Sequence, residues 1–444
     1  MIHFLDYRCF TFFTNFKFIQ ANMGEKMPDN YLALTPESLP ERLYKIKEIA
    51  GKVGTDPNSW DVAEVGDGNL NLVFIVTGDL GKVIVKQALP YVRLVGDSWP
   101  LTLERAFFEY NALIRQEERD PGVVPKVLYF DSAQGLIAME YLENHKILRN
   151  KLIEGEKVDG LSEVLGLHCA RIAFKGSDLY METKTKKSDV SLFEKNIELM
   201  AITENLVFTD PYFNAEMNNN TKGLEKIINI LRNDIKMKSC VQNMLRKFAS
   251  NTETMCHGDL HSGSIMCTND QTRVIDPEFA FYGPMGFDLG MLLANFLMAY
   301  FSQEGHRRNS EQSDYQSWIS TIMKETVKHF QAEFSALWNS ARNGILFPKT
   351  LFEDQGHSSS SALESFLNSI WSDAVGFCGI EMHRRCLSLA HNADFELIED
   401  TKLRAKLEAR NLLMGRDLIL ETQNIDTVAK LITLAQDYNS KDVL

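Results

Sequence analysis

Residues 257–264 read HGDLHSGS, and residues 274–279, a short distance along the chain, read VIDPEF. The two segments carry Asp259 and Asp276, which lie 17 positions apart on the two arms of a predicted β-hairpin. Transfer of a phosphoryl group to a hydroxyl needs one carboxylate that orients and deprotonates the acceptor and a second that holds Mg²⁺ on the phosphates. Both aspartates of such a hairpin can face one γ-phosphate, so the pair predicts phosphoryl transfer.

The same segment contains two histidines, His257 and His261, at a spacing that zinc ligands also use. The glycines Gly258 and Gly263 disfavour the helix that would bring these two imidazoles to one face. In addition, no third ligand follows at the spacing of a metal site. We therefore expect no zinc site here.

The stretch GDGNLN at residues 66–71 lies between two predicted strands. Its residues Gly66, Gly68 and Asn69 form a turn in which backbone N–H groups could approach phosphates without interference from Cβ atoms. A plain hairpin turn explains the same residues without any ligand. Taken alone, this stretch leaves both interpretations open.

Lys86 interrupts the apolar strand pattern VIVKQA. An ammonium group there could hold nucleotide phosphates and pair with a carboxylate of the following helix, as the strand lysine of protein kinases does. Glu109 is the partner that we expect, with Glu104 as the second choice. The alternative is a strand lysine that faces water.

The hydrophobic pattern changes near residue 146. Alternating β-branched residues around glycine turns predict an antiparallel sheet before this point, whereas apolar spacings of three to four residues predict helices after it. The predicted strands are residues 61–66, 72–77, 82–88, 124–131 and 136–142, and residues 266–275 are a further β-rich stretch among the helices. The predicted helices are residues 36–50, 103–116, 161–173, 191–206 and 222–248. The sequence therefore predicts an α+β fold with a small antiparallel-sheet N-lobe and a large, mainly helical C-lobe.

Three units follow from this pattern. Residues 1–30 are expected to be a disordered N-terminal extension, residues 31–142 a β-rich nucleotide-binding lobe, and residues 143–444 a catalytic and substrate-binding lobe. Within the extension, residues 1–22 hold six of the 27 phenylalanines but no cleavage site of a secretory signal. They are either a disordered arm or upstream sequence translated from a misplaced start codon.

Composition narrows the possible partners and the compartment. The chain has 444 residues and a net charge of −13, which argues against non-specific binding to nucleic acid, since that needs a basic face. No apolar run approaches the length of a membrane span. Seven cysteines without a CxxC pair do not form a disulfide framework or a zinc ribbon, so we expect a reducing, cytoplasmic location.

The order of glycine loop, strand lysine, helix glutamate, HGD loop and second aspartate resembles the protein-kinase-like fold, in its aminoglycoside and choline kinase branch. That branch carries an asparagine where this chain has Ser264, and a hydroxyl is a poorer ligand for a hard cation. Glu278 offers a replacement, because two residues on from Asp276 it would share one face of an extended chain. With this exchange, and with segments such as GDSWPLTLERAFFEYNAL and EMHRRCLSLAHNADFE, the chain from about Tyr31 onward resembles the 5-methylthioribose kinase family.

The resemblance implies an activity. It implies ATP-dependent phosphorylation of the 1-hydroxyl of 5-methylthio-D-ribose, which gives S-methyl-5-thio-α-D-ribose 1-phosphate in methionine salvage, and it favours a homodimer. Asp259 would be the catalytic base. Arg384 and Arg385, which base rates alone would place on the surface, would stabilise the transferred phosphoryl group and bind the sugar. Trp99 would contact the methylthio group, although a core tryptophan explains it nearly as well.

The resemblance also implies how ATP would bind. Lys86 and the backbone near Asn69 would position the phosphates, and Asp276 and Glu278 would hold Mg²⁺. The main chain of Glu140, Tyr141 and Leu142 would meet the adenine. Asp288, in GFDLG, is expected to brace the HGD loop rather than touch substrate.

Two other functions remain open from the sequence. The chain could be another small-molecule kinase of the same fold, acting on a different sugar, a choline-like alcohol or an aminoglycoside. An aminoglycoside site should be rich in carboxylates, and the arginine pair argues against it. The chain could also be a catalytically inactive kinase-like binding protein, which the retention of Lys86, Asp259, Asp276 and Glu278 disfavours.

Overall fold

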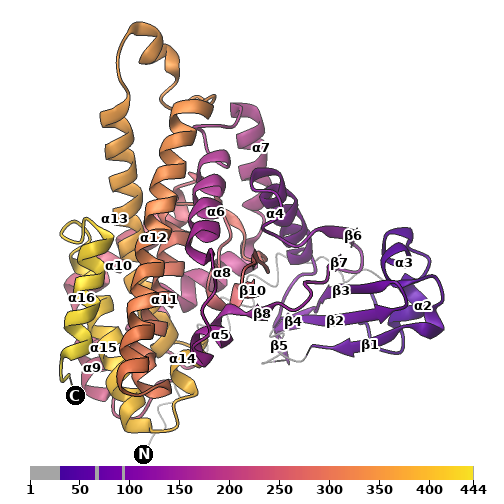
Figure 1. Ribbon diagram of the computed structural model, residues 1–444, viewed down its shortest axis with the longest axis horizontal. Coiled ribbons are helices and arrows are strands. Elements are labelled where there is room, and N and C mark those ends of the chain that lie inside the picture. The colour runs from indigo at the N-terminus through magenta and orange to yellow at the C-terminus, as the bar shows by residue number, and fades with distance from the viewer. Residues whose placement is uncertain (1–30, 66–69, 93–95, 444) are drawn as a thin grey trace, which may run out of the picture.

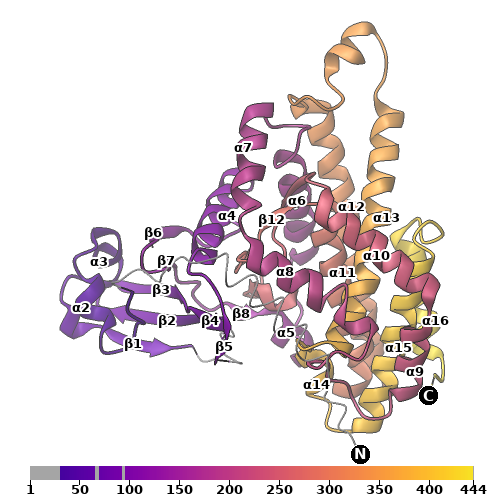
Figure 2. The ribbon, with the colours of Figure 1, turned by 180° about the vertical axis from the view of Figure 1, so that it is seen from behind.

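The computed structural model describes residues 31–65, 70–92 and 96–443. Two lobes lie side by side, one built around a sheet and the other built of helices (Figure 1). The view from behind shows the same division (Figure 2). The expected α+β arrangement of an antiparallel-sheet lobe and a mainly helical lobe is therefore confirmed.

The sheet of the first lobe has five strands, and every neighbouring pair is antiparallel. In spatial order the strands are β1 (Asp61–Glu64), β2 (Asn71–Gly78), β3 (Gly81–Ala88), β7 (Leu136–Glu140) and β6 (Val127–Asp131). A two-residue turn joins β2 to β3, where Gly81 has a φ of +150° that other residues rarely adopt. At Gly78 a Cβ atom would lie 2.3 Å from the carbonyl oxygen of Val53, so the turn needs glycine at both positions.

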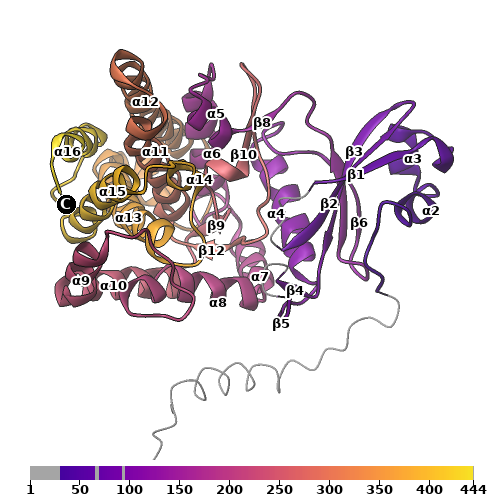
Figure 3. The same ribbon diagram turned by 90° about the horizontal axis from the view of Figure 1, so that it is seen from below.

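Strand β3 turns alternate residues to two different layers. Val83 and Val85 are fully buried in a core formed with the short helices α2 (Leu39–Leu43) and α3 (Lys47–Val53). Side chains of strand neighbours point to opposite faces, so Lys86 lies on the face that α4 (Arg105–Arg119) covers. Figure 3 shows α4 between the sheet and the helical lobe. The lysine is thus directed toward the junction of the lobes and not toward water.

The chain crosses between the lobes after β7. The next strand, β8 (Lys146–Ile147), pairs with β10 (Ile265–Cys267), which in turn pairs with β11 (Thr272–Val274) in the helical lobe. Two further pairs are β9 (Thr254–Cys256) with β12 (Phe281–Gly283), and β4 (Tyr91–Val92) with β5 (Gly96–Pro100). The β10–β11 hairpin is the predicted one, but the two aspartates do not lie on its arms as expected. Asp259 precedes β10, in the HGD loop, and Asp276 follows the end of β11.

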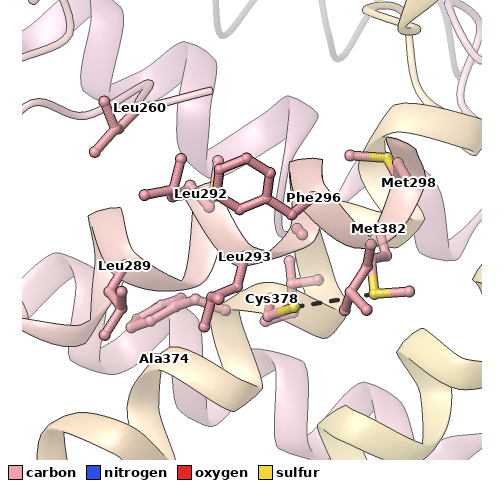
Figure 4. Packing of buried hydrophobic residues seen from close by; sticks show 14 of the residues in the cluster. Leu260, Leu289, Leu292, Leu293, Phe296, Met298, Ala374, Cys378 and Met382 are labelled. Carbon is pink, nitrogen blue, oxygen red and sulfur yellow. Dashed lines mark hydrogen bonds between the residues drawn. The ribbon is translucent and has the colours of Figure 1, made fainter. Parts of the chain in front are cut away.

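Helix α11 (Gly286–His306) is the centre of the second lobe, because it is apolar on nearly all sides and buried over most of its length. It packs along α13 (Ser360–Leu387) through small residues: a Cβ atom on Gly290 would lie 2.5 Å from the carbonyl oxygen of Ala374. Figure 4 shows the leucines of α11 against Ala374, Cys378 and Met382 of α13. This packing fixes the end of α13, which carries Arg384 and Arg385.

The other helices surround this pair. Helix α6 (Leu161–Lys175) packs on α12 (Asn309–Ala341), and α15 (Thr401–Leu420) packs on α13. The remaining helices are α5 (Leu148–Glu154), α7 (Thr183–Phe193), α8 (Ile197–Leu206), α9 (Glu225–Asn233), α10 (Ile235–Ser250), α14 (Ala393–Glu396) and α16 (Val428–Ser440). Among the described residues, no helix is both long and apolar enough to cross a membrane.

Three predicted helices are each divided in two. The helix predicted over residues 36–50 is α2 followed by α3, and α3 continues through Gly51. The helix predicted over 222–248 breaks at Asp234, whose carboxylate caps α10 by accepting a hydrogen bond from the Met237 amide at 2.9 Å. The helix predicted over 191–206 breaks before Asn196, whose side chain donates to the carbonyl oxygen of Glu278 instead.

The core of the helical lobe contains a carboxyl group that titrates far from its usual range. Glu408 of α15 is 1% exposed, and its Oε2 atom has no hydrogen-bond partner among the described residues. Burial raises the pKa of Glu408 to about 7, and Thr221 and Arg404 only partly oppose this. The folded state therefore binds more protons than the unfolded state between pH 4.5 and 7, and stability falls as the pH rises through this window.

Glu408→Gln should remove this pH dependence. Between pH 5 and pH 8 the original protein should lose about 2–3 kcal/mol of unfolding free energy, because the buried carboxyl group ionises. Glu408→Gln should not show this loss, because its side chain does not titrate. Urea unfolding of both proteins at the two pH values measures the difference. Glu399→Gln, at an exposed position, is the control. Parallel stability curves for the original protein and Glu408→Gln would contradict the assignment.

Candidate active site

Helix α11 holds the HGD loop (residues 257–259) through the carboxylate of Asp288. The backbone amides of His257 and Gly258 donate to the two carboxylate oxygens of Asp288, at 2.6 Å and 3.1 Å, which confirms the bracing role expected for Asp288. Gly258 has a φ of +88°, and a Cβ atom there would lie 2.0 Å from the carbonyl oxygen of Phe279. Only glycine lets the loop approach the segment after Asp276 this closely.

Asp259 lies between a histidine and two arginines. Its Oδ2 atom is 3.2 Å from Nε2 of His261, and its Oδ1 atom is 3.2 Å from Nη2 of Arg385 and 3.7 Å from Nη2 of Arg384. Burial would raise the pKa of Asp259, but His261 and the two guanidinium groups outweigh it and hold the pKa well below its usual range. The carboxylate is therefore ionised throughout the physiological range.

The arginine pair is buried and not on the surface. Arg384 is 9% and Arg385 is 5% exposed. Glu381, one turn earlier on α13 and fully buried, accepts from Nε of Arg385 at 2.6 Å and lies 3.5 Å from Nη1 of Arg384. Two buried cations therefore share the carboxylates of Glu381 and Asp259, as buried charges must be paired.

Lys86 joins the two lobes by ion pairs. Its ammonium is 2.9 Å and 2.8 Å from the two carboxylate oxygens of Glu109, so the expected pair is present. It also contacts the carboxylate of Asp276 and lies 3.8 Å from Oε2 of Glu278. Glu104, the second choice, lies at the N-cap of α4 and is exposed.

Three carboxylates converge around this ammonium. One oxygen each of Glu109, Asp276 and Glu278 lies within 4.8 Å of the others. The sequence analysis expected an extended chain to bring Asp276 and Glu278 to one face, but the chain is not extended here. Asp276 has a φ of +65°, in the left-handed region that non-glycine residues avoid, and Glu278 lies in the turn that follows. Such backbone strain is typical of functional sites.

The donor set suits Mg²⁺, which prefers oxygen ligands and carboxylates above all. Burial and the mutual repulsion of the carboxylates raise the pKa values of Glu109 and Glu278 even though Lys86 opposes this. The same carboxylates hold the pKa of Lys86 above its usual range against the effect of burial. Three carboxylates thus surround one ammonium group, and a divalent cation would neutralise the negative charge in excess.

Two residues that the sequence analysis missed connect Glu278 to the glycine loop. The side chain of Asn71 donates to Oε2 of Glu278 at 2.8 Å and accepts from Nη2 of Arg105 at 3.2 Å. The same Nη2 donates to the carbonyl oxygen of Leu70 at 2.5 Å. Asn71 stands in the quoted GDGNLN stretch, so the motif pointed to it, whereas Arg105 carries no sequence signal because its partners are mostly backbone carbonyls.

Glu381 was also missed. Its spacing of three and four residues before Arg384 and Arg385 is the spacing of ion pairs on one helix face, so the pattern was available in the sequence. Ser264 is used within the loop: its hydroxyl donates to the carbonyl oxygen of Asp259 at 2.9 Å. Among the described residues, Glu109, Asp276 and Glu278 form the group of side chains that could hold a metal ion. His257 and His261 are not part of that group.

Some of the expected site residues lie outside the part of the chain that the structure describes. Gly66, Gly68 and Asn69 are not among the described residues, and neither is the side chain of Trp99, which stands in β5. At the junction of the lobes, Glu140 ends β7 and Leu142 is buried. The ammonium of Lys82 lies 5.0 Å from the centre of the Tyr141 ring.

Comparison with known proteins extends over nearly the whole chain. Residues 61–317, more than half of the chain, match the phosphotransferase enzyme family. A methylthioribose kinase from Escherichia coli is 40% identical over 93% of this chain and 100% of its own length. Methylthioribose kinase 1 from Oryza sativa is 38% identical over 91% of this chain and 95% of its own.

A methylthioribose kinase from a Geobacillus strain is 40% identical over 87% of this chain and 93% of its own length. Identity of this degree over nearly the full length of each relative shows the family of this chain. The chain belongs to the methylthioribose kinase family, within the larger phosphotransferase enzyme family.

Proposed function

We propose that this protein transfers the γ-phosphoryl group of ATP to the 1-hydroxyl of 5-methylthio-D-ribose and releases S-methyl-5-thio-α-D-ribose 1-phosphate. The observation that carries the proposal is the pair of buried guanidinium groups within 4 Å of the ionised Asp259 carboxylate. Similarity over nearly the full length to enzymes named methylthioribose kinases supports the choice of acceptor.

Asp259 would act on the acceptor hydroxyl. Its low pKa makes it a weak base, but the transition state of phosphoryl transfer is loose and the nucleophile can lose its proton late. The carboxylate would first accept a hydrogen bond from the 1-hydroxyl and thereby aim the oxygen at the phosphorus atom. It would take the proton as the new O–P bond forms.

Arg384 and Arg385 would serve the transferred phosphoryl group and the sugar. A guanidinium group stabilises charge that spreads over the phosphoryl oxygens and also donates to sugar hydroxyls. Nε of Arg384 is buried and has no hydrogen-bond partner among the described residues. A sugar hydroxyl would satisfy this donor. Trp99 would lie against the methylthio group, since sulfur–aromatic contacts are favourable.

ATP would bind at the junction of the lobes. Lys86, oriented by Glu109, would hold the phosphates together with the backbone at Gly66, Gly68 and Asn69, and the main chain of residues 140–142 would meet the adenine. Asp276 and Glu278 would hold Mg²⁺. When bound, the ion would neutralise charge on the phosphates. Residues 31–142 would thus form the nucleotide-binding lobe and residues 143–444 the sugar-binding lobe.

The cellular setting follows from the same proposal. The product class belongs to methionine salvage, and the enzyme would work in the cytoplasm as a homodimer. Six described cysteines are free and most are buried, which fits a reducing compartment. An aminoglycoside kinase remains the less favoured function, because two buried arginines would repel a polycation.

The direct test is ADP release with Mg-ATP and a panel of acceptors. Turnover should be selective for 5-methylthioribose over ribose, choline and an aminoglycoside. Asp259→Asn should lower kcat by about 10³-fold or more while ATP binding, measured by calorimetry, changes little, because the asparagine cannot accept the proton. Asp270→Asn, in the exposed turn of the β10–β11 hairpin, is the matched control.

The outcomes separate the possible functions. Turnover with another acceptor alone would contradict the proposed substrate and retain the phosphotransferase. Binding of ATP without turnover of any acceptor would favour an inactive kinase-like protein. An Asp259→Asn variant that keeps a tenth of normal turnover would contradict the role of the base.

Glu278→Gln tests the cation site. An amide oxygen carries no net charge and binds Mg²⁺ more weakly than a carboxylate does, so the Mg²⁺ concentration that gives half-maximal turnover should rise at least about tenfold. Titration of turnover with Mg²⁺ at saturating ATP measures this. The same titration of Asp270→Asn should match that of the original protein. An unchanged requirement in Glu278→Gln would show that Glu278 does not hold the ion.

A further inference from the structure

We propose that His261 is a positioning residue for Asp259: as a neutral imidazole, it donates its Nε2–H to Oδ2 and thereby keeps Oδ1 directed at the arginine pair and the acceptor. The inference concerns the chemistry of the same site and so rests on the proposed phosphoryl transfer. The catalytic contact remains that of Asp259, and His261 acts through it.

The hydrogen-bond partners determine which nitrogen carries the proton. The backbone amide of Gly263 lies 2.9 Å from Nδ1 of His261. A backbone amide can only donate, so Nδ1 is the acceptor and carries no proton. The proton of the neutral ring is then on Nε2, which lies 3.2 Å from Oδ2 of Asp259. Burial lowers the pKa of His261 to about 4 although Asp259 opposes this, so the ring is neutral at physiological pH.

Local packing holds the imidazole in this orientation. A Cβ atom on Gly263 would lie 2.6 Å from Cε1 of His261, so only glycine leaves room for the ring there. Next to it, the Ser262 hydroxyl accepts from Nε of Arg149 at 3.1 Å, and Arg149 is anchored 3.3 Å from Oδ2 of Asp394. The loop is thus held from α5 and α14 as well as from α11.

The consequence for Asp259 is that its two oxygens are no longer equivalent. Oδ2 faces the neutral donor and Oδ1 faces two cations. A half-turn of the carboxylate would restore the same arrangement, because its two oxygens are chemically identical, but any smaller rotation would break the contact with His261 and move the other oxygen away from the arginines. Fixing the orientation should affect the transfer step, in which Oδ1 meets the hydroxyl, more than the binding of ATP at the Lys86 cluster.

Two substitutions of His261 distinguish orientation of the Asp259 carboxylate from a role limited to the hydrogen bond with Gly263 within the loop. The amide oxygen of His261→Asn can replace Nδ1 as the acceptor for Gly263, but its side chain is too short to reach Asp259. His261→Gln places an amide N–H where Nε2 stands. We expect His261→Asn to lower kcat about 10²-fold, the loss typical of a misplaced catalytic group, with KM for ATP within about twofold. His261→Gln should recover most of kcat.

Controls and a second measurement make the result decisive. His357→Asn, at an exposed position, should behave as the original protein, and thermal melting checks the fold of each variant. Nitrogen-15 NMR of the original protein at pH 7 should show His261 as the Nε2–H tautomer, a readout that needs no turnover.

Equal kcat in His261→Asn and the original protein, or a His261→Gln variant as slow as His261→Asn, would overturn the proposal. So would an Nδ1–H tautomer or an imidazolium. If the original protein fails to phosphorylate 5-methylthioribose, the proposed function falls, and the NMR result still decides the state of His261.

Discussion

The ammonium of Lys86 is the contact on which the rest of the site depends. It is nearly buried, it comes from the central part of the sheet, and its partners come from α4 and from the segment after β11. A buried charge without partners is costly, so Lys86 requires Glu109, Asp276 and Glu278 to converge. The alternation of β3 directs the lysine to this junction, and the strained backbone at Asp276 brings the carboxylates to meet it.

Two charged clusters therefore flank the β10–β11 hairpin along the chain, one around Asp259 before β10 and one around Asp276 after β11. The Lys86 cluster has more carboxylates than cations and suits a divalent ion, whereas the Asp259 cluster has two arginines and suits a phosphoryl group in transfer. The segments that flank the hairpin are also joined to each other, because Nε2 of His257 donates to the carbonyl oxygen of Ile275 at 2.9 Å. Asp288 then anchors the HGD loop to the buried helix α11.

The sequence predicted those features that depend on local pattern. The two-lobed fold follows from the change of hydrophobic period, and the Lys86–Glu109 pair follows from a polar break in a strand beside a helix. Local pattern could not predict Arg105, whose partners are mainly backbone carbonyls distant in sequence. It also missed the breaks in two predicted helices at Asn196 and Asp234, where side chains form hydrogen bonds with the backbone. The buried state of Arg384 and Arg385 followed only from the family resemblance.

The central claim is that the two clusters act on one phosphoryl group. A crystal structure with Mn²⁺, a non-hydrolysable ATP analogue and 5-methylthioribose tests it most directly. The account predicts an anomalous peak for the metal between Asp276 and Glu278, the γ-phosphoryl group between that metal and the arginine pair, and the sugar 1-hydroxyl within hydrogen-bond distance of Asp259. A sugar bound with its 1-hydroxyl directed away from Asp259, or a metal held elsewhere, would contradict the account.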